Sequence, residues 1–87
     1  MHAVVVRVNI TEMEGSEQEL RNEVVPRASQ APGFVAGYWT RSGNTGLSMI
    51  VFESEDAARQ MADRVPQMVP AGVEFQDAEV REVVASA

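Results

Sequence analysis

The stretch that decides the fold is FVAGYWTRSGNTGLSMIVFES, residues 34–54. Two runs rich in β-branched and aromatic residues, 34–41 and 46–53, flank a short loop that contains glycine and asparagine. Such a loop between two such runs is typical of a β-hairpin. Successive side chains of a strand point to opposite faces of the sheet, and both runs carry large apolar side chains on both faces. We therefore predict a sheet whose two faces are both buried against other parts of the protein or a partner.

The register of this hairpin decides which side chains face the rest of the chain. We predict that Arg41 pairs with Leu47, and a slip by one residue would exchange the two faces. The face expected to lie under helices holds Phe34, Ala36, Tyr38, Thr40, Ser48, Ile50 and Phe52. The opposite face holds Val35, Gly37, Trp39, Arg41, Leu47, Met49, Val51 and Glu53.

The segments outside the hairpin predict two helices and two further strands. In chain order the predicted elements are strand 3–10, helix 16–30, strands 34–41 and 46–53, helix 54–66 and strand 73–85. Ser16 and Glu19 have the spacing of a capping box, and Pro26 predicts a kink or an early last turn in the first helix. Ser54 is the predicted N-cap of the second helix. A phase change in the last strand predicts a bulge near 76–79.

The order βαββαβ predicts an α+β fold of the ferredoxin-like kind, a four-stranded antiparallel sheet with both helices on one face. The 87 residues, 1–87, are expected to form one domain. A chain this short buries only about 60–65% of its unfolded surface, so its own core stabilises it only marginally. Small domains are commonly stabilised by burying apolar surface against a partner.

A second copy of the chain is the expected partner, because no segment is left to cover the second face of the sheet. We therefore predict a sheet-to-sheet homodimer, a dimeric α+β barrel. Its predicted interface residues are Val5, Arg7, Trp39, Arg41, Leu47, Met49 and Val51. Trp39 is expected to anchor the dimer core, with stacking on a ligand as the alternative.

Composition excludes several classes of function. The formal net charge is −6, with seven arginines and no lysine, which disfavours binding to nucleic acids and to anionic membranes. No apolar run approaches the roughly 20 residues of a membrane span, and the first ten residues lack a signal-peptide pattern. We expect a cytoplasmic, bacterial protein. With no cysteine and a single histidine, His2, no disulfide and no metal site is expected.

The residues PGFVAGYW and GLSMIVFESEDAA, taken together, resemble the dimeric α+β barrel superfamily, and within it the antibiotic-biosynthesis monooxygenase-like (ABM-like) proteins. That resemblance implies a ligand pocket between the sheet and the helices. The catalytic Asn, Trp and His of the haem-degrading branch fall here on Val8, Phe52 and about Ala62, which are all apolar. Haem degradation is therefore disfavoured, and no cofactor is expected.

The cofactor-free, quinone-forming branch implies a different set of positions, which fall on Phe52, Ser48 and Ala58. Only Ser48 keeps a hydrogen-bonding group. The pocket candidates are Tyr38, Thr40, Ser48 and Phe52, with ordinary strand-end or core-edge roles as the alternative for the polar ones. We expect a non-catalytic dimer or one that binds a small aromatic ligand; the alternative is a cofactor-free monooxygenase-like enzyme for a phenolic or polycyclic molecule. No catalytic residue is assigned.

Overall fold

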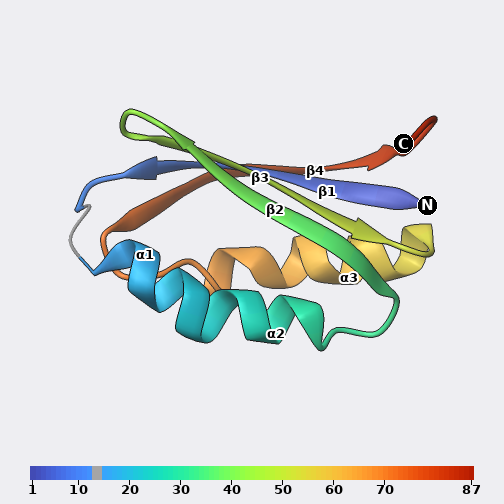
Figure 1. Ribbon diagram of the computed structural model, residues 1–87, viewed down its shortest axis with the longest axis horizontal. Coiled ribbons are helices and arrows are strands. Elements are labelled where there is room, and N and C mark those ends of the chain that lie inside the picture. The colour runs from blue at the N-terminus through green and yellow to red at the C-terminus, as the bar shows by residue number, and fades with distance from the viewer. Residues whose placement is uncertain (13–14) are drawn as a thin grey trace.

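A computed structural model describes residues 1–12 and 15–87 of the chain (Figure 1). Its strands are β1 (His2–Ile10), β2 (Phe34–Ser42), β3 (Thr45–Phe52) and β4 (Val73–Glu82). Its helical segments are α1 (Ser16–Glu19), the π-helical η1 (Leu20–Val24), α2 (Val25–Ser29), α3 (Glu55–Arg64) and the 3₁₀ turn η2 (Val65–Gln67). No helix of these described ranges is long and apolar enough to cross a bilayer.

The strands form one antiparallel sheet in the order β2-β3-β1-β4. The first helix (α1 to α2) and the second helix (α3) both lie on the same face of this sheet (Figure 1). The predicted α+β fold is confirmed, and the layout is compatible with the ferredoxin-like arrangement. β1 is an interior strand of the sheet. Its helix-facing side chains, such as Val4 and Val6, are β-branched and apolar, as an interior strand requires. The predicted bulge in β4 is confirmed, since Asp77 and Phe75 pair with the adjacent residues Arg7 and Val8 and leave an unpaired residue between them.

The first helix is continuous from α1 through η1 to α2. Pro26 has no N–H, and its ring crowds the carbonyl of Asn22 in a regular α-helix. The π turn that precedes it widens the helix at this point, so the predicted kink takes that form and the helix still reaches Ser29. The predicted capping box is wrong: Gly15, at φ 82°, occupies the N-cap position without a side-chain cap.

The second helix begins as its sequence predicts. The hydroxyl of Ser54 accepts a hydrogen bond from the Ala57 amide at 3.2 Å, so its role as N-cap is confirmed. One turn later, Arg59 donates to the carboxylate of Glu55. This hydrogen bond and the guanidinium charge lower the pKa of Glu55. The α-helix ends at Arg64, and the short 3₁₀ turn that follows it contains Pro66.

The predicted register of the hairpin is wrong by one residue. Arg41 pairs with Gly46 instead of Leu47, and Trp39 pairs with Ser48. The turn contains only two residues, and Gly43 takes φ 59°, as the first central residue of a type II′ turn does. A bulge at Val35 then shifts the pairing again, so Phe34 still lies opposite Phe52.

This register exchanges three pairs of predicted positions on β2. Trp39 and Arg41 lie on the helix-facing side with Ser48, whereas Tyr38 and Thr40 lie on the outer face opposite Met49 and Leu47. The expected placement of Trp39 and Arg41 in the outer face is therefore corrected, as is that of Tyr38 and Thr40 beneath the helices. Gly37 likewise lies on the helix-facing side opposite Ile50, and Ala36 lies on the outer face opposite Val51, so their expected places are corrected too. On β1 and β3 the outer face matches the prediction, with Val5, Arg7, Leu47, Met49 and Val51.

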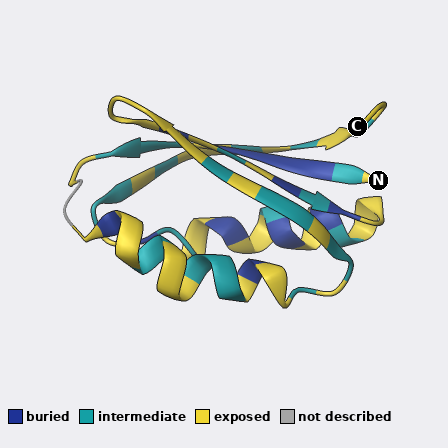
Figure 2. Cartoon of the chain, in the orientation of Figure 1, coloured by how far each residue is buried: buried dark blue, intermediate teal, exposed yellow. Residues whose placement is uncertain are grey.

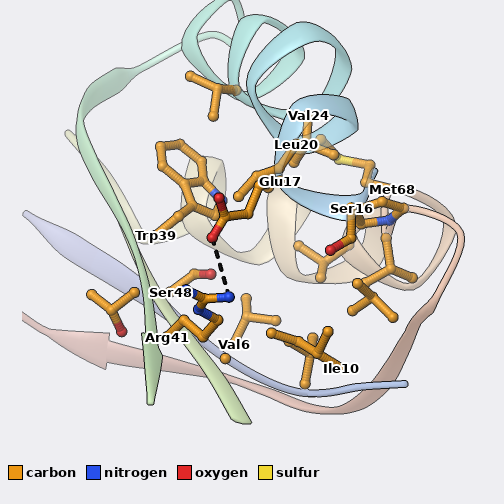
Figure 3. A pocket seen from close by; sticks show the side chains of 18 of the residues that line it. Val6, Ile10, Ser16, Glu17, Leu20, Val24, Trp39, Arg41, Ser48 and Met68 are labelled. Carbon is orange, nitrogen blue, oxygen red and sulfur yellow. Dashed lines mark ion pairs between the residues drawn. The ribbon is translucent and has the colours of Figure 1, made fainter. Parts of the chain in front are cut away.

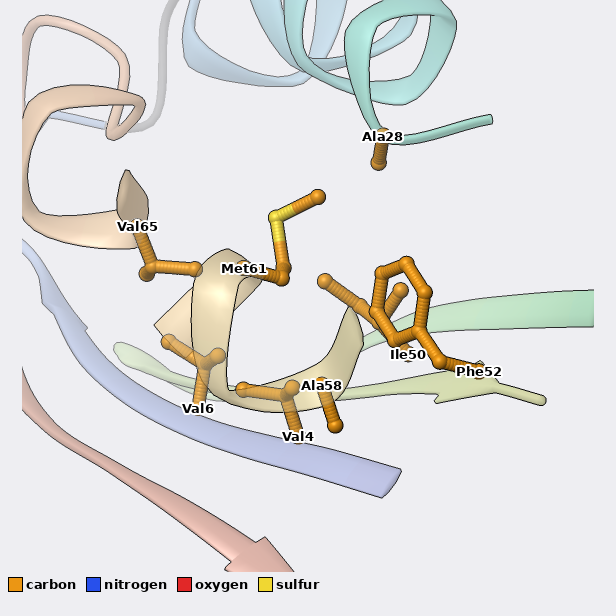
Figure 4. Packing of buried hydrophobic residues seen from close by; sticks show 8 residues of the cluster. All are labelled: Val4, Val6, Ala28, Ile50, Phe52, Ala58, Met61 and Val65. Atoms are coloured by element: carbon orange, nitrogen blue, oxygen red, sulfur yellow. The ribbon is translucent and has the colours of Figure 1, made fainter. Parts of the chain in front are cut away.

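The core lies between the sheet and α3, with α2 closing one side (Figures 2 and 4). Phe52 is completely buried and meets the ring of Phe34 edge to face, with centroids 6.2 Å apart. The helices contribute two small side chains to the same cluster, Ala28 and Ala58, together with Met61. The buried cluster consists of Val4, Val6, Ala28, Ile50, Phe52, Ala58, Met61 and Val65.

Candidate functional site

A cavity of about 320 Å³ lies between the first helix and the hairpin end of the sheet (Figure 3). Val6, Val8 and Ile10 of β1 line it, because alternate side chains of that strand point toward the helices. Leu20 and Val24 line it from η1. Further apolar lining comes from Val65, Met68, Val69, Pro70 and Val73. The cavity is thus a mainly apolar pocket, which we call the helix–sheet pocket.

Gly46 gives this pocket part of its shape. An added Cβ at Gly46 would lie 2.6 Å from Cγ2 of Val8, so the Val8 side chain occupies the space that a β3 side chain would otherwise fill. Ser48 is the next inward residue of β3 and borders the pocket. A glycine followed by a serine therefore leaves β3 with little bulk where the cavity lies.

Trp39 borders the same pocket from β2 (Figure 3). Its six-membered ring lies over Gly37, because an added Cβ there would be 2.7 and 2.8 Å from Cη2 and Cζ3 of the indole. The two residues lie two positions apart on the same face of the strand. The missing side chain at Gly37 therefore decides where the indole rests.

Replacing Gly37 with alanine is expected to move this ring. The chain has one tryptophan, so its indole N–H gives a single resonance in a proton–nitrogen correlation spectrum. That resonance should shift, with a loss of stability of about 1–3 kcal/mol from overpacking. Ser42→Ala is the control, because Ser42 is exposed at the other end of the same strand. An indole resonance unchanged in Gly37→Ala would contradict the position of the ring.

An ion pair spans the mouth of the pocket. Nη1 of Arg41 on β2 lies 3.4 Å from Oε1 of Glu17 on α1, and the two side chains are 46% and 51% exposed (Figure 3). Arg21, one turn along the first helix, also borders the pocket. Of the part of the chain that the structure describes, the mouth thus carries two guanidinium groups and one carboxylate, although the overall charge of the chain is negative.

The far end of the pocket is closed by a loop that hydrogen bonds fix in place. The Ala71 amide donates to the Glu19 carboxylate at 2.8 Å, which joins this loop to α1. The carbonyl of Gly72 accepts from the amide and the hydroxyl of Thr11 beyond β1. Pro70, buried in this loop, faces the cavity. The Glu19 side chain therefore fixes a loop of the pocket wall and does not form the predicted capping box.

The predicted pocket residues divide into two groups. Ser48 and Thr40 border the pocket, although the Thr40 hydroxyl is directed to the Leu47 carbonyl. Tyr38 is 64% exposed on the outer face, and Phe52 lies in the core. Neither of these two lines the helix–sheet pocket. The binding role of each candidate stays a prediction.

The sequence interpretation missed several residues that the structure brings to the pocket. These are Ser16, Glu17, Leu20, Arg21, Trp39 and Arg41. A two-residue turn at Gly43 and Asn44 would have placed Trp39 and Arg41 there, because it sets the register. Within residues 1–12 and 15–87, no group of three or more His, Cys, Asp or Glu side chains is placed to hold a metal ion.

Comparisons with known proteins give no family assignment. The sequence matches no protein-family model, and it matches no curated protein.

Proposed function

We propose that this protein binds a small, mainly apolar, aromatic molecule in the helix–sheet pocket. The observation that carries the proposal is the cavity itself, about 320 Å³, lined by β1, β3 and the first helix. Small-molecule sites span roughly 300–1,000 Å³ and combine apolar walls with a few polar groups. This volume is at the lower end of that range, which favours a ligand of one or two rings.

Two side chains support an aromatic occupant. Trp39 borders the pocket, and an indole offers a large surface for offset or edge-to-face contact with another ring. Ser48 lies opposite it on β3, and its hydroxyl can donate or accept a hydrogen bond. Together they give an apolar contact and a polar orienting group within one pair of residues.

Titration with α-naphthol tests this proposal, with the Trp39 indole resonance as the reporter. We expect saturable shifts of that resonance and of the β1 amides near Val8. Ser48→Leu, which places an apolar side chain in the cavity, is expected to weaken binding by at least about tenfold, since bulk there occupies the ligand's space. Ser42→Leu is the matched control, because Ser42 is exposed at the hairpin tip. Equal binding by both variants would place the ligand elsewhere.

A second candidate is a cofactor-free monooxygenase-like activity at the same place. The observation that favours it is that Ser16 and Ser48 both border this apolar pocket. Fixed donors near a developing phenolate stabilise it best where water is excluded. An enzyme of this kind would convert α-naphthol and one O₂ into the quinone and water. Consumption of O₂ that saturates with α-naphthol and is lost in Ser48→Leu would support this activity over simple binding.

A homodimer, formed by a second copy on the outer face of the sheet, is part of the proposal. Support comes from the apolar half of that face over β2 and β3, where Tyr38, Leu47 and Met49 are 64%, 46% and 45% exposed. Exposed apolar patches of this kind mark interaction surfaces. The β4 half is charged, and its charges pair internally: Arg7 with Asp77 at 3.4 Å, and Arg81 with Glu79 at 2.8 Å.

A further inference from the structure

The mouth of the helix–sheet pocket has a different electrostatic character from the rest of the chain. The chain carries a formal charge of −6, yet two arginines, Arg21 and Arg41, border this one cavity. They come from η1 and β2, two elements that are far apart in the sequence. Among residues 1–12 and 15–87, Glu17 is the acidic side chain that borders the cavity with them.

Glu17 contributes little to folding through this pair. Its carboxylate lies 3.4 Å from the Arg41 guanidinium, but both side chains are about half exposed. Water and salt screen such a pair, and the cost of ordering two long side chains offsets most of the attraction. Another carboxylate that brought additional apolar contacts could therefore replace Glu17 at low cost.

The position of Glu17 also indicates which chemistry fits. A carboxylate of the chain already lies beside Arg41 at the opening of an apolar cavity. The planar guanidinium matches the geometry of a carboxylate and is always charged at physiological pH. A ligand with an apolar body and one terminal carboxylate would place its body against Val8 and Trp39 and its charge at this mouth.

We propose that the ligand of this pocket is an aromatic monocarboxylate, which displaces Glu17 from Arg41 as it binds. Arg21 is the second cation of the mouth and favours the same charge. This inference rests on the proposed ligand-binding function and adds the chemical class of the ligand. Arg41 acts as a binding residue, and Glu17 acts as an internal competitor for it.

The test compares two probes that share a naphthalene body. β-Naphthoate carries the carboxylate, and methyl β-naphthyl ketone is its uncharged counterpart of nearly the same shape. Calorimetric or NMR titration is expected to show about tenfold tighter binding of the naphthoate, because hydrogen bonds to charged groups are stronger than neutral ones. Raising the salt concentration should weaken the naphthoate alone.

The variants give effects of opposite sign. Arg41→Gln should remove most of the preference for the naphthoate and leave binding of the ketone unchanged. Glu17→Gln should tighten the naphthoate about threefold, because it removes the competing carboxylate. Arg59→Gln is the matched control, since Arg59 pairs with Glu55 on α3 and does not border the pocket.

The outcomes separate the two levels of the proposal. Saturable binding of the ketone, with equal affinity for the naphthoate and no effect of Arg41→Gln or Glu17→Gln, would overturn the carboxylate inference and leave the ligand-binding function standing. Failure of both probes to bind would overturn both. If Arg41→Gln does not fold, the Glu17→Gln result and the salt dependence still decide, because a tightening specific to the naphthoate requires the displaced carboxylate.

Discussion

Phe52→Ala is expected to lower the free energy of unfolding by about 3–5 kcal/mol. The ring is completely buried, and its edge-to-face contact with Phe34 would be lost. The helices contribute Ala28 and Ala58 to the same cluster, and these side chains are too short to fill the resulting cavity (Figure 4). A loss of this size removes much of the total stability of a small domain, which is about 5–15 kcal/mol.

Urea denaturation followed by circular dichroism measures this effect. Phe34→Ala is the control, because it deletes the same atoms from the other ring of the pair at a position that is only partly buried. The loss in Phe34→Ala should be clearly smaller. Equal losses in the two variants would contradict the central position of Phe52 in the core.

Met49→Asp is expected to weaken the proposed dimer by more than about a hundredfold, because it buries a charge without a partner in the interface. Met49 lies in the middle of the exposed apolar patch, opposite Tyr38 on β2 and next to Val5 on β1. Its side chain faces away from the helices, so the aspartate of a monomer is solvated and the fold is retained. The expected result is a folded monomer at micromolar concentration.

Light scattering coupled to size-exclusion chromatography measures the mass of wild type and variant. Val84→Asp is the control, since Val84 is 88% exposed beyond the end of β4 and should leave the mass unchanged. A wild type that is already monomeric at micromolar concentration would overturn the dimer proposal. A dimer that withstands Met49→Asp would show that a different surface forms it.

Much of the fold could be predicted from local signals in the sequence. Ser54 before an acidic first turn predicted the start of α3, and the hydroxyl does cap it. The broken alternation after Phe75 predicted the bulge in β4. The spacing of Leu20, Val24 and Ala28, four residues apart, predicts an apolar stripe on the first helix. These residues do face inward, the first two toward the pocket and the third into the core. Each of these features depends on residues close together in the chain, where one physical effect dominates.

The register of the hairpin depended on more than local alternation. Tyr38 and Trp39 are both large aromatic residues on adjacent positions, so either could have pointed toward the helices. The outcome is decided by the tight turn at Gly43 and by the bulge at Val35, two irregularities that alternation alone does not reveal. The error changed the predicted site, because it placed Trp39 and Arg41 on the wrong face.

The first helix was interpreted from its apolar stripe, its predicted cap and its proline, and its polar contribution to the pocket was missed. Glu17 and Arg21 have the charges of an ordinary solvated helix surface. Their significance arises only when α1 lies beside the end of β2 and Glu17 comes within 3.4 Å of Arg41. Such a pairing between distant segments is visible only in the assembled fold.

The π turn of η1 has a consequence for how the protein can change over time. An α-helix rotates by about 100° per residue, and a π turn contains one residue more than regular winding would, as an insertion into an α-helix does. The wide turn at Leu20–Val24 takes up this extra residue, so α2 keeps the facing that it would have in a shorter, regular helix. Deleting one residue within the wide turn is therefore expected to leave Ala28 in the core, whereas a deletion in a regular α-helix turns everything beyond it by about 100°. The first helix can thus lose a residue here while the packing of α2 is retained.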